Sequence, residues 1–302
     1  MKKVIVAGAS GLIGKTLCKE LKKRGYEIGV IARNSKEAKK QIPFANFFAQ
    51  WEDEKKLEGL INGSCAVINL AGAPIIGKRW SNNYKKVILD SRIKATGKIV
   101  ETIKHAKIKP KVFINGSAVG YYGIDNKRIC DENEKPGDDF LAKVCKAWED
   151  EAIKAEAEKV RVVLIRSAIV LDKSDGALPK MLTPFKFFVG GPIGSGKQFF
   201  PWIHIEDEIG IILYSLENEK VHGAINASAP EVVTNKNFAK ILGGVLNRPS
   251  FLPVPTFALK LLYGEAASTL TTGTQVSSDK IMSLGYLFKY PQLKSALENI
   301  LQ

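Results

Sequence analysis

Three glycines near the start of the chain have the spacing of a phosphate-binding turn. Gly8, Gly11 and Gly14 follow a short apolar run over 4–7 and lead into a stretch with helical spacing over 12–23. Glycines let the backbone approach a pyrophosphate closely, and a helix start offers free N–H groups and the positive end of the helix dipole. The pattern alone is weak in a chain with 26 glycines, but its strand–turn–helix context predicts a dinucleotide-binding site.

Arg33 stands just after the next apolar run, over 28–32. In sites for NAD, an Asp or Glu about twenty residues after the glycines binds the ribose 2′-hydroxyl. An arginine at this place suits a 2′-phosphate instead. The sequence therefore predicts NADP(H) as the cofactor, although an arginine at the end of a strand is also a common surface residue.

Strand and helix patterns continue to alternate beyond this unit. The expected strands cover 44–48, 65–70, 112–115 and 162–165. The expected helices run from an N-cap at Ser81 to about Lys107 and over 140–158. Near-continuous apolar strands alternating with helices predict an α/β fold with a Rossmann-type, doubly wound parallel sheet. Ligands of such sheets bind at the carboxyl ends of the strands.

The pattern loosens after about residue 172 into loops and shorter helices. These helices are expected over 178–189, 207–217, 237–246, 255–265 and 291–301. We predict an NADP-binding Rossmann domain over 1–172, with sheet elements returning from the C-terminal half. A smaller substrate-side lobe is predicted over 173–302.

Composition limits the kinds of partner. The formal charge of +14 comes mostly from lysines spread along helix faces, without a basic tail or interleaved aromatic residues, so no nucleic-acid partner is expected. No apolar stretch approaches about eighteen residues, and we expect no membrane partner. Four cysteines without paired spacing and three scattered histidines predict no metal site and a cytoplasmic location.

Several motifs together resemble a known family. They are GASGLIG (8–14), NLAGAPI (69–75), RW (79–80), DSRIKAT (90–96), GSAVGYYG (116–123), FLAKVCKAWE (140–149), RSAIVL (166–171), GGPIGSGKQFFPWIH (190–204) and, in a segment from Pro253, GE (264–265). The chain resembles the extended short-chain dehydrogenase/reductase superfamily. More narrowly, it looks like the atypical "epimerase family" proteins, also labelled putative cell-division inhibitors. The resemblance covers nearly the whole chain.

The resemblance implies a set of cofactor-binding positions. They are Gly8, Ser10, Gly11, Leu12, Ile13, Gly14, Ala32, Arg33, Leu70, Ala71, Gly72, Arg92, Ser117 and Val170.

Superfamily catalysis normally uses a serine and a Tyr-x-x-x-Lys pair, whose members share one helix face. In the matching helix the tyrosine position is Leu141 and the lysine position is Cys145, whereas the serine survives as Ser117. Arg92 stands where a structural asparagine is usual. Leucine cannot donate a proton, so the standard mechanism is not available.

Five residues are candidates for the missing chemistry. Tyr121 or Tyr122 could present a phenol as proton donor, or could pack against the wall of the pocket. Cys145 could act as an acid or nucleophile if its pKa were depressed, or could be a small apolar residue. Arg92 could contact the cofactor in place of the lysine, or could form a surface ion pair. Ser117 is expected to hydrogen-bond the substrate oxygen.

Two further motifs are interpreted as structural. The segment 191–197 reads GPIGSGK, but Gln198 stands where a nucleotide-binding P-loop needs Ser or Thr, so we expect it to shape the substrate pocket. His204 is interpreted as structural rather than as a general base, because the family resemblance places it between the substrate loop and a helix.

Two functions fit this sequence. The first is an NADP(H)-dependent oxidoreductase or epimerase-like enzyme that acts on a small carbonyl or hydroxyl substrate, with a non-standard proton donor. The alternative is a non-catalytic NADPH sensor or scaffold, which Leu141 and Cys145 at the Tyr and Lys positions favour. A classical nucleotide-sugar epimerase is disfavoured by the missing pair. The chain is expected to be a monomer or a homodimer.

Overall fold

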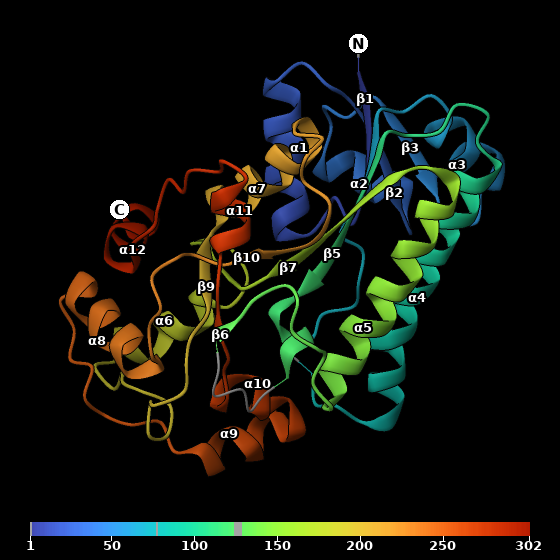
Figure 1. Cartoon of the computed structure of the whole chain (residues 1–302). Coiled ribbons are helices and arrows are strands. Elements are labelled where there is room, and N and C mark those ends of the chain that lie inside the picture. Colours follow the sequence, from blue (N-terminus) through green and yellow to red (C-terminus); the bar gives the residue numbers. More distant parts are fainter. Residues whose placement is uncertain (1, 77, 124–128) are drawn as a thin grey trace.

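The computed structural model describes residues 2–76, 78–123 and 129–302. Its centre is a seven-stranded sheet in which every pairing is parallel, with the strand order β10-β7-β5-β4-β1-β2-β3 (Figure 1). The strands are β1 (Lys3–Ala7), β2 (Glu27–Ala32), β3 (Phe47–Gln50), β4 (Ala66–Asn69), β5 (Val112–Ala118), β7 (Arg161–Ser167) and β10 (Gly223–Ala227). The predicted α/β class and Rossmann-type sheet are confirmed.

Helices cover both faces of this sheet. The helices of the first part are α1 (Leu12–Lys23), α2 (Ser35–Gln41), α3 (Glu54–Ile61), α4 (Asn82–His105) and α5 (Phe140–Ile153), which continues as the 3-10 turn η2 (Lys154–Glu158). Alternate strand residues enter two separate cores. Val4 and Val6 pack in the core that contains α1 and α7 (Ile205–Glu217), whereas Ile5 and Ala7 pack in the core that contains α3 and α4. The strands are therefore buried on both sides, as their continuous apolar runs predict.

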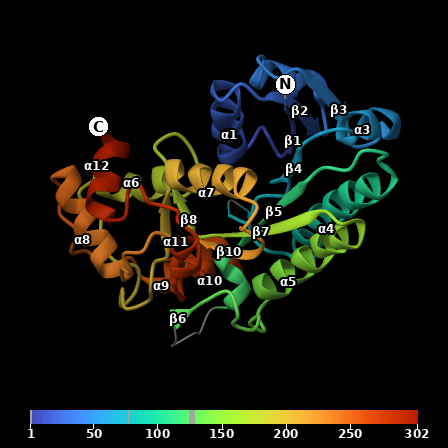
Figure 2. The same cartoon turned by 45° about the horizontal axis from the view of Figure 1, so that its top comes forward.

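The C-terminal part forms a third core beside the sheet (Figure 2). The core is built from β8 (Ile169–Leu171), α6 (Leu178–Lys186), β9 (Trp202–His204), α8 (Asn235–Leu246) and α12 (Leu293–Leu301). The C-terminal part also contains α9 (Thr256–Tyr263), η3 (Gly264–Ala267), α10 (Ser268–Thr271) and α11 (Asp279–Ser283). Two short strands, β6 (Ile129–Cys130) and β11 (Gln275–Val276), pair with each other. A turn, η1 (Val119–Tyr122), follows β5. None of the helices in the described ranges is long and apolar enough to cross a membrane.

One buried carboxylate holds the C-terminal segment against the sheet domain. Asp207, in the first turn of α7, accepts hydrogen bonds from the backbone N–H groups of Lys289 (2.7 Å) and Tyr290 (2.9 Å). The hydroxyl of Tyr286 also donates to this carboxylate, at 3.0 Å. The chain that leads into α12 is thus attached to the helix that covers the sheet.

Two predicted elements are shorter than expected because the chain turns. The strand expected over 44–48 begins only at Phe47, because α2 ends at Gln41 and the chain must turn first, with the Ala45 N–H bonded to the Ile42 carbonyl. The helix expected over 178–189 ends at Lys186, because the backbone reverses at Phe188, whose φ is +62°. A non-glycine residue in that region cannot continue a right-handed helix.

Candidate functional site

The glycine turn between β1 and α1 has no room for larger residues. Gly8 has a φ of +78°, and a Cβ there would lie 2.5 Å from the carbonyl carbon of Leu70. A Cβ on Gly14 would lie 2.3 Å from the Gly8 carbonyl oxygen. Gly11 is the N-cap of α1, and among the described residues no side chain caps this helix start. Its first N–H groups can therefore serve an anion such as a pyrophosphate, and the turn fits a dinucleotide.

Arg33 lies at the same edge of the sheet as this turn. Ala7, the last residue of β1, pairs with Ile31 of β2, so Arg33 follows two residues beyond that level. Its side chain is exposed, and Asn34 next to it caps α2. An exposed guanidinium here can contact a phosphate on the adenosine side of a bound dinucleotide.

A cavity of about 400 Å³ extends from the glycine turn to the C-terminal part. Its described lining residues are Gly8, Gly11, Leu12, Ile13, Gly14, Leu70, Ile75, Ile76, Leu141, Ile169, Val170, Gly176, Ala177, Met181, Thr269 and Leu270. None of these carries a titratable side chain. The hydroxyl among them, that of Thr269, donates to the Ala266 carbonyl at 2.8 Å. The wall is therefore apolar away from the turn.

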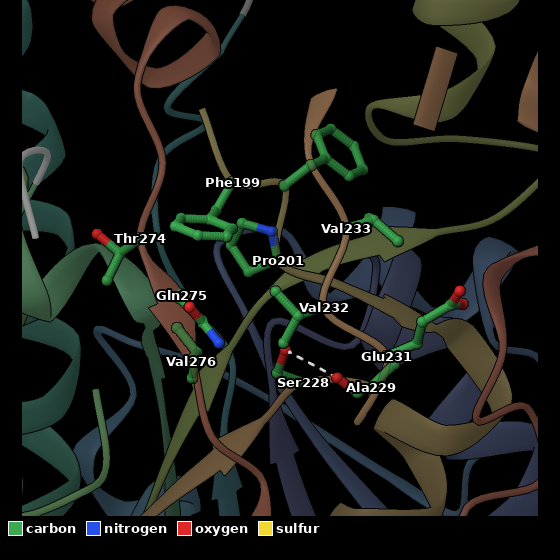
Figure 3. A pocket seen from close by; sticks show the side chains of 11 residues that line it. Phe199, Pro201, Ser228, Ala229, Glu231, Val232, Val233, Thr274, Gln275 and Val276 are labelled. Atoms are coloured by element: carbon green, nitrogen blue, oxygen red, sulfur yellow. Dashed lines mark hydrogen bonds between the residues drawn. The ribbon is translucent and has the colours of Figure 1, made fainter. Parts of the chain in front are cut away.

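A much smaller hollow lies elsewhere in the C-terminal part. It measures about 10 Å³ and lies between Phe199, Val233 and Gln275 (Figure 3). This volume has room for about one water molecule. The larger cavity at the glycine turn is therefore the better candidate for a ligand site.

Ser117 is held by a buried ion pair. Its hydroxyl donates to Glu149 Oε1 at 2.6 Å, and Glu149 forms a bidentate pair with Arg166 at 2.9 and 2.8 Å. The side chains of Glu149 and Arg166 are each only 4% exposed. Because the proton of Ser117 points to the carboxylate, its oxygen is left as an acceptor in this arrangement.

Tyr121 and Tyr122 pack around the same arginine. The Arg166 guanidinium lies 3.5 Å from the ring centre of Tyr121, and its Nη1 donates to the Tyr122 hydroxyl at 3.0 Å. The Tyr122 hydroxyl in turn donates to Asn226 Oδ1 at 2.5 Å. Burial raises the pKa of Tyr122 above its ordinary value. Neither tyrosine is among the residues that line the cavity at the glycine turn.

Leu141 and Cys145 of α5, which stand where the family resemblance expects Tyr and Lys, differ in their surroundings. Leu141 lines the cavity, where the superfamily has a tyrosine. Cys145 lies one turn further along α5, is 4% exposed, and has a pKa raised by burial to about 12. A thiol with this pKa is protonated at neutral pH, so the observed environment opposes the nucleophile interpretation.

Arg92 is not on the surface, which excludes the surface ion pair as its role. It is 7% exposed, and its Nη1 donates to the carbonyls of Ala73 (3.1 Å) and Ile88 (3.0 Å). Its guanidinium carbon lies 2.9 Å from where a Gly72 Cβ would be, and 5.0 Å from the ring centre of Trp148. Arg92 thus supports the loop after β4 that borders the cavity.

The remaining predicted residues occupy varied places. Leu70, Val170 and the glycine-turn residues Leu12 and Ile13 line the cavity. Ala71 N–H donates to the buried Asn69 side chain at 3.2 Å, which fixes the start of the loop after β4. Of the other predicted cofactor residues outside this lining, Ser10 is exposed and Ala32 is partly buried at the end of β2.

The segment 191–197 and His204 were both interpreted as structural, and both form contacts within the protein. In the segment 191–197, Ile193 forms a bridge with Val254 rather than leading into a helix. None of these residues lines the cavity at the glycine turn, so a role in shaping the substrate pocket stays a prediction. His204 is the N-cap of α7, where its Nδ1 accepts the Glu206 N–H at 3.0 Å. Its ring also stacks on Tyr290. Burial lowers the pKa of His204, which keeps the imidazole neutral for this acceptor role.

Sequence reasoning missed the charges behind the cavity. Glu149 and Arg166 stand inside motifs that carry the family resemblance, but nothing in their spacing indicates that they pair. Asn226, on β10, contacts Tyr122 from more than a hundred residues away in the chain. Within the described residues, no group of three His, Cys, Asp or Glu side chains is placed to hold a metal ion, and the four cysteines form no disulfide.

The fold and the glycine turn define a dinucleotide-binding protein of the short-chain dehydrogenase/reductase type. Comparison with models of protein families finds the "NAD dependent epimerase/dehydratase family" over residues 4–228 and the "Domain of unknown function (DUF1731)" over residues 254–300. The chain belongs to the NAD dependent epimerase/dehydratase family.

Individual relatives show which members of this family the chain is similar to. The chain is 43% identical to "Epimerase family protein SDR39U1 homolog, chloroplastic" of Arabidopsis thaliana, over 99% of this chain and 86% of the relative. It is similar to the crystal structure of the human epimerase family protein SDR39U1 with NADPH, with 34% identity, a TM-score of 0.88 and coverage of 99% and 98% of the two chains. The predicted resemblance to "epimerase family" proteins is confirmed.

The wider fold is also found in UDP-glucuronic acid 4-epimerase from Bacillus cereus. That structure has a TM-score of 0.79 at 22% identity, over 99% of this chain and 97% of the epimerase. At this identity the likeness concerns the fold alone.

Proposed function

We propose that this chain binds NADP(H) at the glycine turn and acts as an oxidoreductase or epimerase-like enzyme on a small carbonyl or hydroxyl substrate. The observation that carries the proposal is the cavity of about 400 Å³ that joins the glycine turn to Leu141 and α10. The NADPH in the human relative's crystal structure supports the choice of cofactor. When bound, the nicotinamide supplies or accepts a hydride at the substrate carbon.

Different residues of the chain would bind different parts of the cofactor. The N–H groups at the start of α1 would hold the pyrophosphate, and Arg33 would bind the 2′-phosphate. Arg92 holds the backbone of Ala73 and would fix the loop beside the cofactor. We propose 1–172 as the cofactor domain and 173–302 as the substrate side, because Met181 and Leu270 complete the cavity from the second part.

The wall of the cavity favours an apolar substrate. Ile75, Leu141, Met181 and Leu270 line it, and burial of their surface against an apolar ligand contributes roughly 25 cal/mol per Å². A strongly charged substrate would meet no opposite charge from these side chains. We therefore propose an apolar aldehyde, ketone or alcohol as the substrate class.

The proton donor is proposed among Tyr121 and Tyr122, with Ser117 contacting the substrate oxygen and Cys145 kept as a weaker candidate. The Tyr122 hydroxyl must leave Asn226 to reach a substrate, so its removal has two distinguishable effects. A structural role predicts that Tyr122→Phe lowers the free energy of unfolding by about 1 kcal/mol and leaves kcat unchanged. A catalytic role predicts a fall in kcat of about a hundredfold or more. A Tyr121→Phe/Tyr122→Phe variant with full turnover would remove the phenol proposal.

The second candidate is a non-catalytic NADPH sensor, which the absence of titratable side chains from the described cavity lining favours. The deciding experiment combines NADPH titration with NADPH oxidation measured across a panel of apolar and polar carbonyl compounds. Turnover that increases with the apolar character of the carbonyl compound supports the enzyme. Tight NADPH binding without turnover on any compound supports the sensor. A cytoplasmic location and a monomer or homodimer remain predictions.

A further inference from the structure

Large apolar side chains are exposed together in the C-terminal part. They come from the turn after α6, from the loop after α8 and from α9, and we call them the apolar surface: Phe187, Phe188, Val189, Phe251, Leu252, Phe257, Leu261 and Leu262. The eight residues of α9 include none that is buried. Exposed apolar groups scattered singly need no explanation, but a group of this size marks an interaction site.

Backbone hydrogen bonds hold the three segments next to each other. The Leu252 N–H donates to the Gly190 carbonyl at 3.4 Å, and the Val254 N–H donates to the Pro192 carbonyl at 2.8 Å. Helix α9 begins at Thr256, directly after this pairing, and lies at an edge of the molecule away from the seven-stranded sheet (Figure 1). The three segments are therefore neighbours in space, and we refer to the side that they expose as one face.

The two stretches of chain that carry this face contain charged side chains of one sign. Residues 176–205 and 232–264, which contain the whole apolar surface, include no Asp or Glu. Their basic residues are Lys180, Lys186, Lys197, Lys236, Lys240, Arg248 and Lys260. The acids that follow the two stretches are already paired, Glu206 with Lys289 and Glu265 with Lys85. A positive field of this extent attracts an anionic surface.

The shape of the face distinguishes between kinds of anionic partner. Phe187, Phe251, Phe257 and Leu261 are each 73–74% exposed, so they project outward rather than line a groove. Interfaces between proteins are instead depleted in lysine relative to the rest of the surface. Projecting Phe and Leu side chains among lysines suit the zone between headgroups and acyl chains of a membrane.

We propose that the apolar surface docks on a lipid bilayer with anionic headgroups. This goes beyond the proposed NADPH chemistry and does not depend on it. The sequence predicted no membrane partner because it lacks a spanning segment, but peripheral docking needs only a surface, which forms when these three segments come together.

Co-sedimentation with vesicles tests the proposal. The full-length protein is mixed with vesicles of phosphatidylcholine alone or of phosphatidylcholine with phosphatidylglycerol, with and without NADPH. We expect binding to the anionic vesicles that weakens as salt is added. A Phe257→Ser/Leu261→Ser variant should bind about tenfold or more weakly, because it loses two apolar contacts. Lys186→Gln/Lys260→Gln should weaken binding on the order of tenfold.

Leu287→Ser is the matched control, since Leu287 is 88% exposed and lies outside the apolar surface. It should bind anionic vesicles as the unmodified protein does, and circular dichroism should show all variants folded. The proposal is overturned if the unmodified protein binds neither vesicle, if it binds both equally, or if Leu287→Ser loses binding as much as the α9 variant. Dimers that Phe257→Ser/Leu261→Ser converts to monomers, without vesicle binding, would assign the surface to a second copy instead.

Discussion

Leu141 and Cys145 remove the phenol and the ammonium group from the helix face that borders the cavity. Two charged groups near this helix face, Glu149 and Arg166, do not line the cavity. They form a buried ion pair, and Glu149 accepts the hydrogen bond of the Ser117 hydroxyl. Each of these groups is already satisfied by protein partners. The residues that look most reactive in the sequence therefore contribute first to the stability of the site, and any catalytic use of them has to compete with those bonds.

Arg33 gives the most direct prediction for the cofactor. Arg33→Asp removes a cation and places a carboxylate where the 2′-phosphate would bind, so we expect NADPH affinity to fall by about tenfold or more. NADH affinity should fall less or rise, because an Asp can accept the ribose 2′-hydroxyl. Fluorescence titration with both cofactors measures this. Lys22→Asp makes the same charge change in the exposed last turn of α1, at the end of this helix away from the glycine turn, and should leave both affinities unchanged; equal losses in the two variants would contradict the assignment.

The buried pair gives a prediction for stability. Glu149→Gln leaves the Arg166 cation buried without its partner carboxylate, and we expect the free energy of unfolding to fall by about 3–5 kcal/mol. Asp150→Asn is the control, because Asp150 pairs with Lys146 at the surface and its loss should cost about 0–1 kcal/mol. Urea denaturation measures both. A loss below about 1 kcal/mol for Glu149→Gln would show that the pair is dispensable.

At the scale of elements, the sequence predicts where strands and helices lie but not how distant ones meet. The alternation of apolar runs and helical periodicity places β1, α1, β2 and α4 within a few residues of their observed ends, because each depends on local spacing. The predicted end of α6 was wrong by three residues, because no local pattern indicates the left-handed turn at Phe188, where Arg248 from a later segment lies 4.4 Å from the ring centre.

The same limit applies to the candidate site. The glycine turn could be predicted, because the glycine spacing, the positive φ of Gly8 and the crowding of Gly14 by Gly8 all lie within one strand–turn–helix unit, whereas the crowding of Gly8 by Leu70 depends on β4. The contact between Tyr122 and Asn226 could not, because it depends on β10 joining the sheet beside β7. The position of Thr269 in the cavity wall likewise results from the folding of the C-terminal part beside the sheet.

Helix α7 carries a buried acid that makes stability depend on pH. Glu208 is fully buried, and burial raises its pKa from 4.5 to about 7. Its Oε1 accepts the Ser167 hydroxyl at 2.6 Å, whereas Oε2 has no hydrogen-bond partner among the described residues. Between the two pKa values the unfolded chain has lost the proton that the folded chain keeps. Stability therefore falls as pH rises through this window and levels off above it.

Glu208→Gln tests this linkage. The amide keeps a polar group near Ser167 but cannot ionise, so from about pH 5 to about pH 8 the variant should gain stability relative to the unmodified protein, on the order of 3 kcal/mol. Unfolding free energies across this range measure the gain. Glu206→Gln, on the exposed side of the same turn, should change stability by less than about 1 kcal/mol. A pH-independent difference for Glu208→Gln would mean that the carboxyl ionises normally in the folded protein.

At the scale of the whole molecule, the cavity couples parts that are far apart in the chain. Gly11 and Leu141 belong to the sheet domain, whereas Met181 and Leu270 belong to the C-terminal part, and all four line one space. The segment that reaches the cavity through α10 is also the one that carries the exposed α9. Binding of a ligand in the cavity should therefore stabilise elements of both the sheet domain and the C-terminal part.

Hydrogen exchange measured with and without NADPH tests this coupling. If the cofactor fills the cavity, amide exchange should slow at the start of α1, and also in α6 and in the α9–α10 segment, because local opening of these elements would then require release of the ligand. Helix α8 does not line the cavity and serves as the internal control. The Arg33→Asp variant at the same NADPH concentration should show weaker protection at all of these places together. Protection confined to residues before 172 would contradict a shared cavity, and would place the C-terminal part outside the cofactor site.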